Sequence, residues 1–242
     1  MKAMIFAAGL GTRLKPFTDN APKALAKVGD STLLERNIRY LQRYGITDVI
    51  VNVHHFGDMI ENLLTTNNGF GSKVTISDER NAVLETGGGL KKAAWYFEDE
   101  PAFVVMNVDV LTNLDLSRLI AAHNPVSAGT LAVSKRASSR QLLFNNEMTL
   151  CGWKNNGTGE EKISRAEEQL HAFAFSGIQV LSNAIWNNAP FDGKFSLIDL
   201  YLHTAKNGII KGFDHSGDIF IDVGKPESIA EAERLFTPSP KG

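Results

Sequence analysis

The chain has 242 residues, of which 43% are hydrophobic, enough for one sizeable core or two tightly joined lobes. Its 25 basic and 27 acidic residues nearly cancel, and no basic stretch is interleaved with aromatic residues, which argues against nucleic acid as the main partner. No run approaches the roughly 20 apolar residues of a membrane span, and the single cysteine, Cys151, cannot form an internal disulfide. We therefore expect a cytoplasmic protein with no membrane or nucleic-acid partner, and the sequence indicates no oligomeric state.

Periodic patterns of apolar residues predict strands and helices that alternate along the chain. We expect buried strands over residues 4–8, 48–53, 73–77, 102–106, 129–134, 172–181 and 219–223. We expect helices from Ser31 to a stop at Gly45, and over 57–64, 90–97, 114–123, 197–206 and 226–236. In the first helix, Thr32 and Glu35 are spaced as a capping box. The alternation indicates a single α/β domain over residues 1–236, followed by a frayed tail at 237–242.

Residues 138–169 interrupt this alternation. Polar residues, pairs of asparagines and the turn Gly157-Thr158-Gly159 separate short β-like pieces. We expect an excursion that carries hairpins above the sheet. The hexapeptide repeats of a β-helix do not occur in the sequence.

The first predicted strand runs directly into a glycine-rich turn, Gly9-Leu10-Gly11-Thr12-Arg13, and Pro22-Lys23 follows. Glycine lets the backbone approach a ligand closely, and successive N–H groups in such a turn form an anion-binding concavity. Arg13 and Lys23 place two cations beside it. The pattern predicts a polyphosphate site, with an ordinary glycine turn as the alternative.

Two common glycine motifs do not fit this turn. A P-loop needs Lys and then Ser or Thr directly after its last glycine, whereas Thr12-Arg13 follow Gly11. A dinucleotide fingerprint needs a small residue where Leu14 stands. It also needs an acidic residue at a strand end about twenty positions on, where Asp30 falls in a turn. The dehydrogenase interpretation therefore fails.

The longer string from Ala7 to Lys23, with Pro16, Thr18 and Pro22 at fixed spacings, resembles the signature of the sugar-1-phosphate nucleotidyltransferases. The resemblance implies a three-layer, Rossmann-like α/β fold with a central, mostly parallel mixed sheet and no appended acyltransferase domain. It implies that the loop wraps a nucleoside triphosphate, that Arg13 contacts its phosphates, and that Lys23 stabilises the reacting α-phosphate. The nucleotide contacts implied in this segment are Ala8, Gly9, Gly11, Thr12, Arg13 and Lys23.

Aspartates at two strand ends are candidates for a magnesium site. Asp109 follows the strand at 102–106, and Asp222 lies in the strand at 219–223. Mg²⁺ takes oxygen ligands and usually one or two carboxylates. A lone strand-end aspartate is more often a turn or a helix cap. Both positions resemble the family's metal-binding aspartates, which implies Mg²⁺ at Asp109 and Asp222 and a nucleotide contact at Asn107. Val108 stands where the family usually has glycine, and its Cβ is expected to crowd the nucleotide or shift the Asp109 backbone.

A second glycine run, Leu84-Glu85-Thr86-Gly87-Gly88-Gly89-Leu90, precedes the predicted helix at 90–97. A run of this kind at a helix N-terminus offers free N–H groups and the positive end of the helix dipole, unless it is an ordinary helix-entry turn. In the family this segment lies against the base and ribose, which implies nucleotide contacts at Thr86, Gly87 and Gly88. The amino-acid sequence of this run is similar to that of the bacterial N-acetylmuramate 1-phosphate uridylyltransferases, as are the sequences of residues 193–197 and 222–233.

The sugar side of the predicted site has weaker signals. Phe175-Ser176-Gly177-Ile178 resembles the family segment whose glycine backbone lies against the sugar, which implies a contact at Gly177. Many relatives have Glu-Lys-Pro shortly before this segment, whereas here Glu161-Lys162 lies farther back and Ile163 follows. Lys162 is therefore a sugar-phosphate ligand or part of a solvated charged loop. The six histidines show no metal-ligand spacing.

The resemblance implies an Mg²⁺-dependent enzyme that joins a nucleoside triphosphate to a sugar 1-phosphate and releases pyrophosphate, with Arg13, Lys23, Asp109 and Asp222 as catalytic residues. UTP and N-acetylmuramate 1-phosphate are the favoured substrates, with a role in cell-wall recycling. The alternative within the class is a guanylyltransferase acting on mannose or heptose 1-phosphate. The alternative of another class is a non-catalytic sensor of nucleotides or nucleotide sugars.

Overall fold

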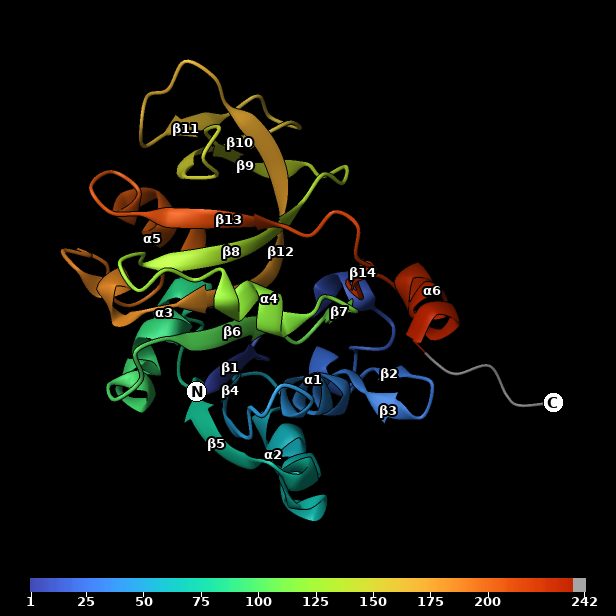
Figure 1. The fold of residues 1–242 in the computed structure, drawn as a ribbon. Coiled ribbons are helices and arrows are strands. Elements are labelled where there is room, and N and C mark those ends of the chain that lie inside the picture. Colours follow the sequence, from blue (N-terminus) through green and yellow to red (C-terminus); the bar gives the residue numbers. More distant parts are fainter. Residues whose placement is uncertain (237–242) are drawn as a thin grey trace. The chain divides into compact units, whose positions relative to one another are not determined.

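The computed structural model of the protein describes residues 1–236 (Figure 1). The tail predicted to fray, residues 237–242, lies outside the described residues. Contacts divide the chain into two units. The first unit consists of Lys2–Val83, Met106–Asn113 and the described part of Ile219–Gly242, and the second consists of Met1, Leu84–Val105 and Leu114–Asp218. The chain passes from the second unit into the first within β6 (Phe103–Asn107).

The first unit is built on a parallel sheet in which β4 (Asp48–Val53) lies between β1 (Ala3–Phe6) and β5 (Lys73–Asp78). Every residue of β1 is buried, as expected of an interior parallel strand. Two helices, α1 (Leu33–Gln42) and α2 (Gly57–Thr66), belong to this unit. The short elements are β2 (Lys27–Val28), β3 (Ser31–Thr32) and the 3₁₀ turns η1 (Thr12–Leu14), η2 (Lys23–Leu25) and η3 (Asn68–Gly71).

A small antiparallel sheet joins two distant parts of the chain within the first unit. β7 (Val110–Thr112) pairs with β14 (Phe220–Asp222), and Asp222 lies opposite Val110 in the register. The final helix, α6 (Pro226–Phe236), packs on β14 and β2, and Figure 1 shows it in red beside them. This pairing brings the C-terminal segment to the turn that follows β6.

The second unit is built around its longest strand, β12 (His171–Leu181). β12 pairs in antiparallel fashion with β8 (Gly129–Ser134) and β9 (Arg140–Phe144), and β13 (Ile210–Asp214) runs parallel to β8. The remaining elements are α3 (Glu85–Lys92), η4 (Ala94–Phe97), α4 (Leu116–Ala121), β10 (Leu150–Asn155), β11 (Glu161–Ile163), η5 (Asn183–Trp186) and α5 (Leu197–Thr204).

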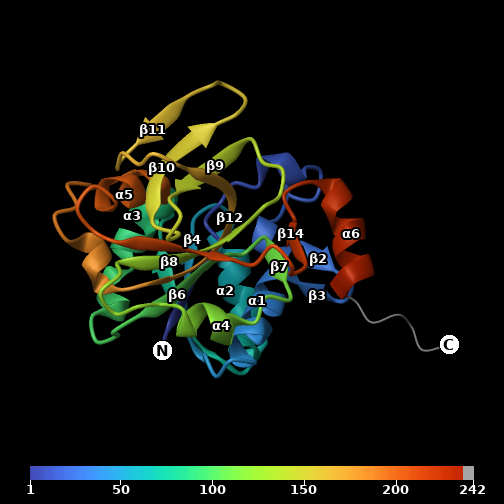
Figure 2. The ribbon, with the colours of Figure 1, turned by 45° about the horizontal axis from the view of Figure 1, so that its top comes forward.

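The segment predicted as an excursion, residues 138–169, forms hairpins in the structure, and they continue the strand order from β12 rather than lying above the sheet. β9, β10 and β11 form two consecutive antiparallel pairs in this segment. Figure 2 shows β10 and β11 in yellow at the end of this run of strands. The loop between β10 and β11 contains Gly159 with φ +74°, a value that favours glycine.

The α/β fold class with a mixed sheet is confirmed, and several predicted boundaries are corrected. The strand predicted at 48–53 has those bounds in the structure, whereas the one predicted at 4–8 ends at Phe6. The helix predicted at 90–97 is wrong in its start, because α3 begins at Glu85 and only the short turn η4 covers 94–97. The division into two units does not test the prediction of a single domain over residues 1–236, which stays a prediction. Among the described residues, no helix combines the length and apolar character that crossing a membrane requires.

Candidate functional site

The glycine-rich turn after β1 is held by a buried side chain from the neighbouring strand. Ala7 N–H donates to Asn52 Oδ1 at 2.8 Å, and Asn52 is only 2% exposed. Leu14 is fully buried and anchors the far end of the turn, whereas Gly9, Thr12 and Arg13 are exposed. The turn therefore presents its glycine backbone to solvent between two buried anchors.

The two glycines of this turn have different structural roles. Gly11 has φ +64°, and a Cβ on it would lie 2.9 Å from Thr18 Cγ2. Its carbonyl accepts hydrogen bonds from Leu14 N–H at 2.9 Å and from the Thr18 hydroxyl at 2.8 Å. Gly9 has no such constraint, because a Cβ there would meet nothing within 4 Å. Folding alone explains glycine at position 11, whereas Gly9 leaves open space beside the exposed backbone.

We expect Gly9→Ala to leave the melting temperature within about 2 °C of wild type, because the added methyl group meets no atom and fits the backbone. The same methyl group should raise the KM for a triphosphate that lies against this backbone by at least about ten-fold, the factor that corresponds to about 1.4 kcal/mol. Gly11→Ala is the contrasting variant, because it should lower both stability and activity. An unchanged KM in a stable Gly9→Ala protein would show that no ligand approaches this glycine.

Four charged side chains of the first unit, Arg13, Lys23, Asp109 and Asp222, form what we call the charge cluster. The Lys23 ammonium donates to Asp109 Oδ2 and lies 3.9 Å from Asp222 Oδ1. Arg13 Nη2 lies 4.0 Å from Asp222 Oδ2. The Lys23 side chain is 10% exposed and that of Asp109 19%, so water screens this pair less than a surface pair. The structure thus brings together four residues that the sequence predicted to act together.

Secondary structure explains how the distant Asp222 reaches Asp109. Asp109 lies in the turn between β6 and β7, and the β7–β14 register sets Asp222 opposite Val110. Val223 N–H also donates to Asp109 O at 2.8 Å. Gly224 completes the arrangement, because a Cβ there would lie 2.7 Å from Asp222 Oδ1 and 3.1 Å from Arg13 Nη2.

Arg13 is the least constrained member of the charge cluster. Its side chain is 64% exposed, and its partner Asp222 is 48% exposed. Exposed ion pairs of this kind contribute little to stability, about 0 to 1 kcal/mol, because water and salt screen them. The Arg13 guanidinium is therefore available for an incoming anion.

Asp109 and Asp222 are suitable ligands for a hard divalent cation. A cation, the Lys23 ammonium, already lies against both carboxylates, which shows that their oxygens face a shared position. Within residues 1–236, no group of three or more His, Cys, Asp or Glu side chains has metal-binding geometry. Two carboxylates suit Mg²⁺ held jointly with substrate phosphates and water.

Val108, whose Cβ is expected from the sequence to crowd the nucleotide or shift the Asp109 backbone, is buried in the structure. The residue is 4% exposed, and its φ is not positive. Val108 N–H donates to Phe6 O at 3.1 Å, and its carbonyl accepts from Asn37 Nδ2 at 2.7 Å. The buried Asn37 of α1 and the end of β1 therefore hold this backbone in place, with the valine side chain packed into the protein.

We expect Val108→Gly to lower the free energy of unfolding by about 2 to 4 kcal/mol, from lost burial and the greater freedom of a glycine chain. The KM for the triphosphate should stay within two-fold of wild type, because the valine side chain is packed inside the protein. Chemical denaturation and steady-state kinetics measure the two effects. Val126→Gly removes the same side chain from a position that is 74% exposed and serves as the control. A several-fold lower KM in Val108→Gly would contradict this account.

The glycine run at 87–89 corrects the expectation of free N–H groups at the N-terminus of a helix. It lies inside α3, and the N–H groups of Gly87 and Gly88 donate to Phe195 O at 2.9 and 3.2 Å. A Cβ on Gly87 would lie 2.4 Å from the Phe195 ring, and one on Gly88 would lie 2.1 Å from Gly193 O. These two N–H groups are thus occupied, and the two glycines allow close packing against residues 193–195.

Thr86, like Glu85 before it, is exposed. Its hydroxyl oxygen accepts from Leu197 N–H at 3.1 Å, at the start of α5. Ser196 caps the same helix, since its hydroxyl accepts from Ile198 N–H at 3.1 Å. Thr86 therefore helps to fix the N-terminus of α5, and its exposure leaves it accessible to a ligand.

The predicted sugar-side residues both lie in the second unit. Gly177 has φ +68° and is part of a break in the β8–β12 register. Lys162 on β11 is half exposed, with its ammonium 3.6 Å from Glu160 and 3.7 Å from Asp199 and above the Trp153 ring. The Lys162 charge thus has acidic and aromatic neighbours on the protein and stays accessible to solvent. Asn107 and Ala8, two further predicted contacts, are half-buried in the first unit.

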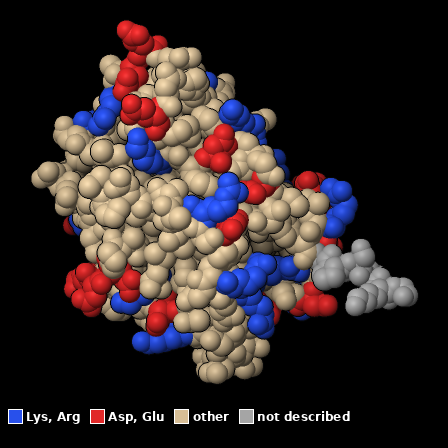
Figure 3. All heavy atoms as spheres, viewed as in Figure 1, with Lys and Arg blue, Asp and Glu red and all other residues tan. Residues whose placement is uncertain are grey.

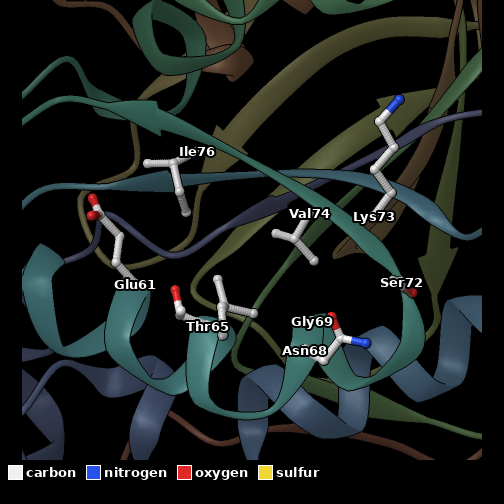
Figure 4. A pocket seen from close by; sticks show the side chains of 9 residues that line it. Glu61, Thr65, Asn68, Gly69, Ser72, Lys73, Val74 and Ile76 are labelled. Carbon is white, nitrogen blue, oxygen red and sulfur yellow. The ribbon is translucent and has the colours of Figure 1, made fainter.

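A separate hollow of about 450 Å³ lies between α2, η3 and β5 (Figure 4). Glu61 and Thr65 of α2 face it from one side, and Val74 and Ile76 of β5 form an apolar wall. None of the predicted site residues lines it. Over the face shown in Figure 3, basic and acidic side chains are interspersed.

Sequence reasoning missed three supporting residues. Asn52 and Asn37 are both 2% exposed and form hydrogen bonds with backbone groups next to the site. Gly224 leaves room for the side chains of Arg13 and Asp222. Asn52 had a detectable signal, because it is a polar residue in the otherwise apolar strand pattern of 49–53. The side-chain contact of Asn37 depends on tertiary packing and left no such pattern.

Comparison with known proteins identifies the family. The model of the nucleotidyl transferase family matches residues 2–142. The N-acetylmuramate alpha-1-phosphate uridylyltransferase of Caulobacter vibrioides is 30% identical over 238 residues, covering 96% of this chain and 95% of that protein. The chain belongs to the nucleotidyl transferase family.

Other members of this nucleotidyl transferase family are similar at comparable identity. The D-glycero-alpha-D-manno-heptose 1-phosphate guanylyltransferase of Campylobacter jejuni is 27% identical, covering 94% of this chain and 96% of that protein. Among solved structures, HddC from Yersinia pseudotuberculosis complexed with GMP-PN is 27% identical with a TM-score of 0.78, covering 98% of this chain and 99% of that one. The family members similar to this chain thus include both uridylyl- and guanylyltransferases.

Proposed function

We propose that the protein is a uridylyltransferase that joins UTP and N-acetylmuramate 1-phosphate to give the nucleotide sugar and pyrophosphate. The observation that carries this proposal is the charge cluster, in which Lys23 contacts Asp109 and approaches Asp222 beside an exposed glycine backbone. The 30% identity to the Caulobacter vibrioides uridylyltransferase over nearly both full lengths supports the choice of substrates. With these substrates the enzyme takes part in cell-wall recycling in the cytoplasm.

In the proposed reaction, an oxygen of the sugar 1-phosphate attacks the α-phosphorus of the triphosphate in line with the departing pyrophosphate. Such reactions depend mainly on positioning and on stabilisation of charge. The backbone at Gly9 admits the triphosphate, and Lys23 stabilises the charge that develops on the α-phosphate. Arg13 binds the departing pyrophosphate. No general base is required, because the attacking phosphate oxygen is already anionic.

Asp109 and Asp222 are the residues that would hold Mg²⁺ in this reaction. When bound, Mg²⁺ supplies a Lewis acid that orients the α-phosphate and neutralises its charge. Before substrate binds, the Lys23 ammonium offsets the negative charge of the two carboxylates. On triphosphate binding, the Lys23 ammonium shifts part of its interaction from Asp109 to the phosphate oxygens.

A second candidate within the class is a guanylyltransferase acting on heptose or mannose 1-phosphate. It is favoured by the 27% identity to the Campylobacter jejuni heptose 1-phosphate guanylyltransferase and by the similarity to HddC, whose structure contains GMP-PN. A non-catalytic sensor is disfavoured by the presence of Lys23, Asp109 and Asp222 together in one cluster.

The deciding experiment is a matrix of four nucleoside triphosphates against N-acetylmuramate, glucose, mannose and heptose 1-phosphates, with pyrophosphate release as the readout. We expect the highest kcat/KM with UTP and N-acetylmuramate 1-phosphate, and loss of turnover when EDTA is added. Higher kcat/KM with GTP would establish the guanylyltransferase instead. Triphosphate binding without turnover in any combination would establish the sensor.

A further inference from the structure

The strand that carries Gly177 has a large break in its pairing. Ala174 and Phe175 of β12 pair with Ser134 and Val133 of β8, and the next pair is Gln179 with Leu131. Residues 176–178 of β12 therefore face a single residue of β8, Ala132. Such bulges bend a strand, leave backbone groups outside the ladder and often direct residues into functional sites.

Two side chains hold this bulge from neighbouring segments. Arg136 Nη2 donates to Phe175 O at 2.6 Å. His215 Nε2 lies 2.7 Å from Ser176 Oγ, and both residues are nearly fully buried, at 3% and 1% exposure. Since His215 directly follows β13 and its N–H donates to Val133 O at 3.0 Å, the imidazole is fixed to the β8 edge of the bulge.

Asp218 lies beside the His215 ring, at ion-pair rather than hydrogen-bond distance. Its Oδ2 lies 3.7 Å from His215 Nδ1, and Asp218 N–H donates to His215 O at 2.9 Å. Burial lowers the pKa of His215 below its ordinary value, which favours the neutral ring. A neutral ring has one donor and one acceptor nitrogen, and the carboxylate favours the proton on Nδ1. Nε2 then accepts the hydrogen bond that the Ser176 hydroxyl donates.

Ser176, His215 and Asp218 are the residue types of a hydrolytic triad, but His215 Nδ1 and Asp218 Oδ2 lie 3.7 Å apart, too far for the hydrogen bond that such a triad requires. The burial of Ser176 also argues against a hydrolytic role, because a nucleophile must reach its substrate and Ser176 is only 1% exposed. The same burial suits a structural clamp on the bulge, directly beside Gly177.

We propose that His215, with the Asp218 carboxylate beside its ring, is a positioning residue for the sugar 1-phosphate, acting through Ser176 to fix the backbone of Gly177. This inference rests on the proposed function and on the sugar contact at Gly177 that the family resemblance implies. The clamp restrains a glycine at φ +68°, a residue type with unusually broad conformational freedom. Its loss should therefore weaken sugar 1-phosphate binding without altering triphosphate binding.

The test compares Ser176→Ala and Asp218→Asn with wild type, and measures separate KM values for the two substrates. We expect the KM for the sugar 1-phosphate to rise about three- to ten-fold, the factor expected for one lost hydrogen bond, and the KM for the triphosphate to stay within two-fold. Ser134→Ala is the matched control, because it removes a buried hydroxyl of β8 that makes no hydrogen bond within residues 1–236. It should leave both KM values unchanged.

His215→Gln and His215→Ala provide an independent readout. Glutamine can hydrogen-bond to Ser176, so its KM for the sugar 1-phosphate should lie closer to wild type than that of the alanine variant. Equal rises in both KM values, or no rise in folded Ser176→Ala and Asp218→Asn proteins, would overturn the positioning role alone. A wild-type protein inactive with every sugar 1-phosphate would overturn the proposed function, and this inference with it.

Discussion

Replacing Lys23 by methionine is expected to lower kcat by about two to three orders of magnitude, the usual effect of removing one preorganised electrostatic donor from a transition state. Methionine keeps an unbranched side chain as far as Cε, with sulfur in place of the Cδ methylene, and removes the ammonium. Because the Lys23 side chain is 10% exposed and contacts Asp109, water cannot fully replace its charge. Pyrophosphate release at saturating substrate measures the effect.

Lys15→Met is the matched control for Lys23→Met. Lys15 belongs to the same N-terminal segment, but its side chain is 61% exposed and pairs with the exposed Asp19. The control should therefore keep kcat within two-fold of wild type, since a surface pair of this kind contributes little. A folded Lys23→Met enzyme with more than a tenth of the wild-type kcat would exclude the proposed role of the ammonium.

Gly88→Ala should lower the free energy of unfolding by about 2 kcal/mol. The added Cβ would lie 2.1 Å from Gly193 O, and a backbone carbonyl cannot rotate away as a side chain can. Overpacking of this kind costs up to about 3 kcal/mol, and the better helix propensity of alanine offsets about 1 kcal/mol. For a protein of this size, the melting temperature should fall by roughly 4 to 8 °C.

Differential scanning calorimetry of Gly88→Ala beside Gly217→Ala tests this steric account. A Cβ on Gly217 meets nothing within 4 Å, so the control should melt within about 2 °C of wild type. Unchanged melting of Gly88→Ala would show that residues 193–195 move aside at no cost. The glycine run would then require an explanation based on the ligand rather than on packing.

The charge cluster was predictable because its members stand at strand ends and in a dense motif. The spacing of Gly9, Gly11 and Arg13 after an apolar strand indicates an anion site, and Asp109 and Asp222 follow or end apolar strands. The carboxyl ends of strands are where α/β proteins bind ligands, which makes these aspartates candidates, and the family resemblance supplies their roles. The three-residue strands β7 and β14 that join the two aspartates are too short to leave a pattern of their own.

The glycine run at 87–89 was misread because local propensity and tertiary packing disagree there. Each glycine in a helix costs about 1 kcal/mol relative to alanine, so three in a row indicate a loop. In the structure α3 includes all three, and close contact with Phe195 and Gly193 leaves no room for a Cβ on Gly87 or Gly88. Contacts between segments a hundred residues apart are not encoded in a local window.

Val108 shows a similar limit at a single position. The sequence places a valine where relatives usually have glycine, but it cannot say which way that side chain points. The structure buries it, with Asn37 and Phe6 holding the backbone on either side. A change of residue type beside a site is therefore compatible with an unchanged site when the new side chain enters the core.

The pairing of β14 with β7 also has a consequence for the order of events during synthesis. The ribosome delivers Arg13, Lys23 and Asp109 long before Asp222, which depends on one of the last strands to emerge. A nascent chain therefore carries a glycine turn and a lysine–aspartate pair but lacks the second carboxylate. Competence for catalysis should appear only after Phe220–Asp222 has left the exit tunnel, so that incomplete chains do not consume triphosphate.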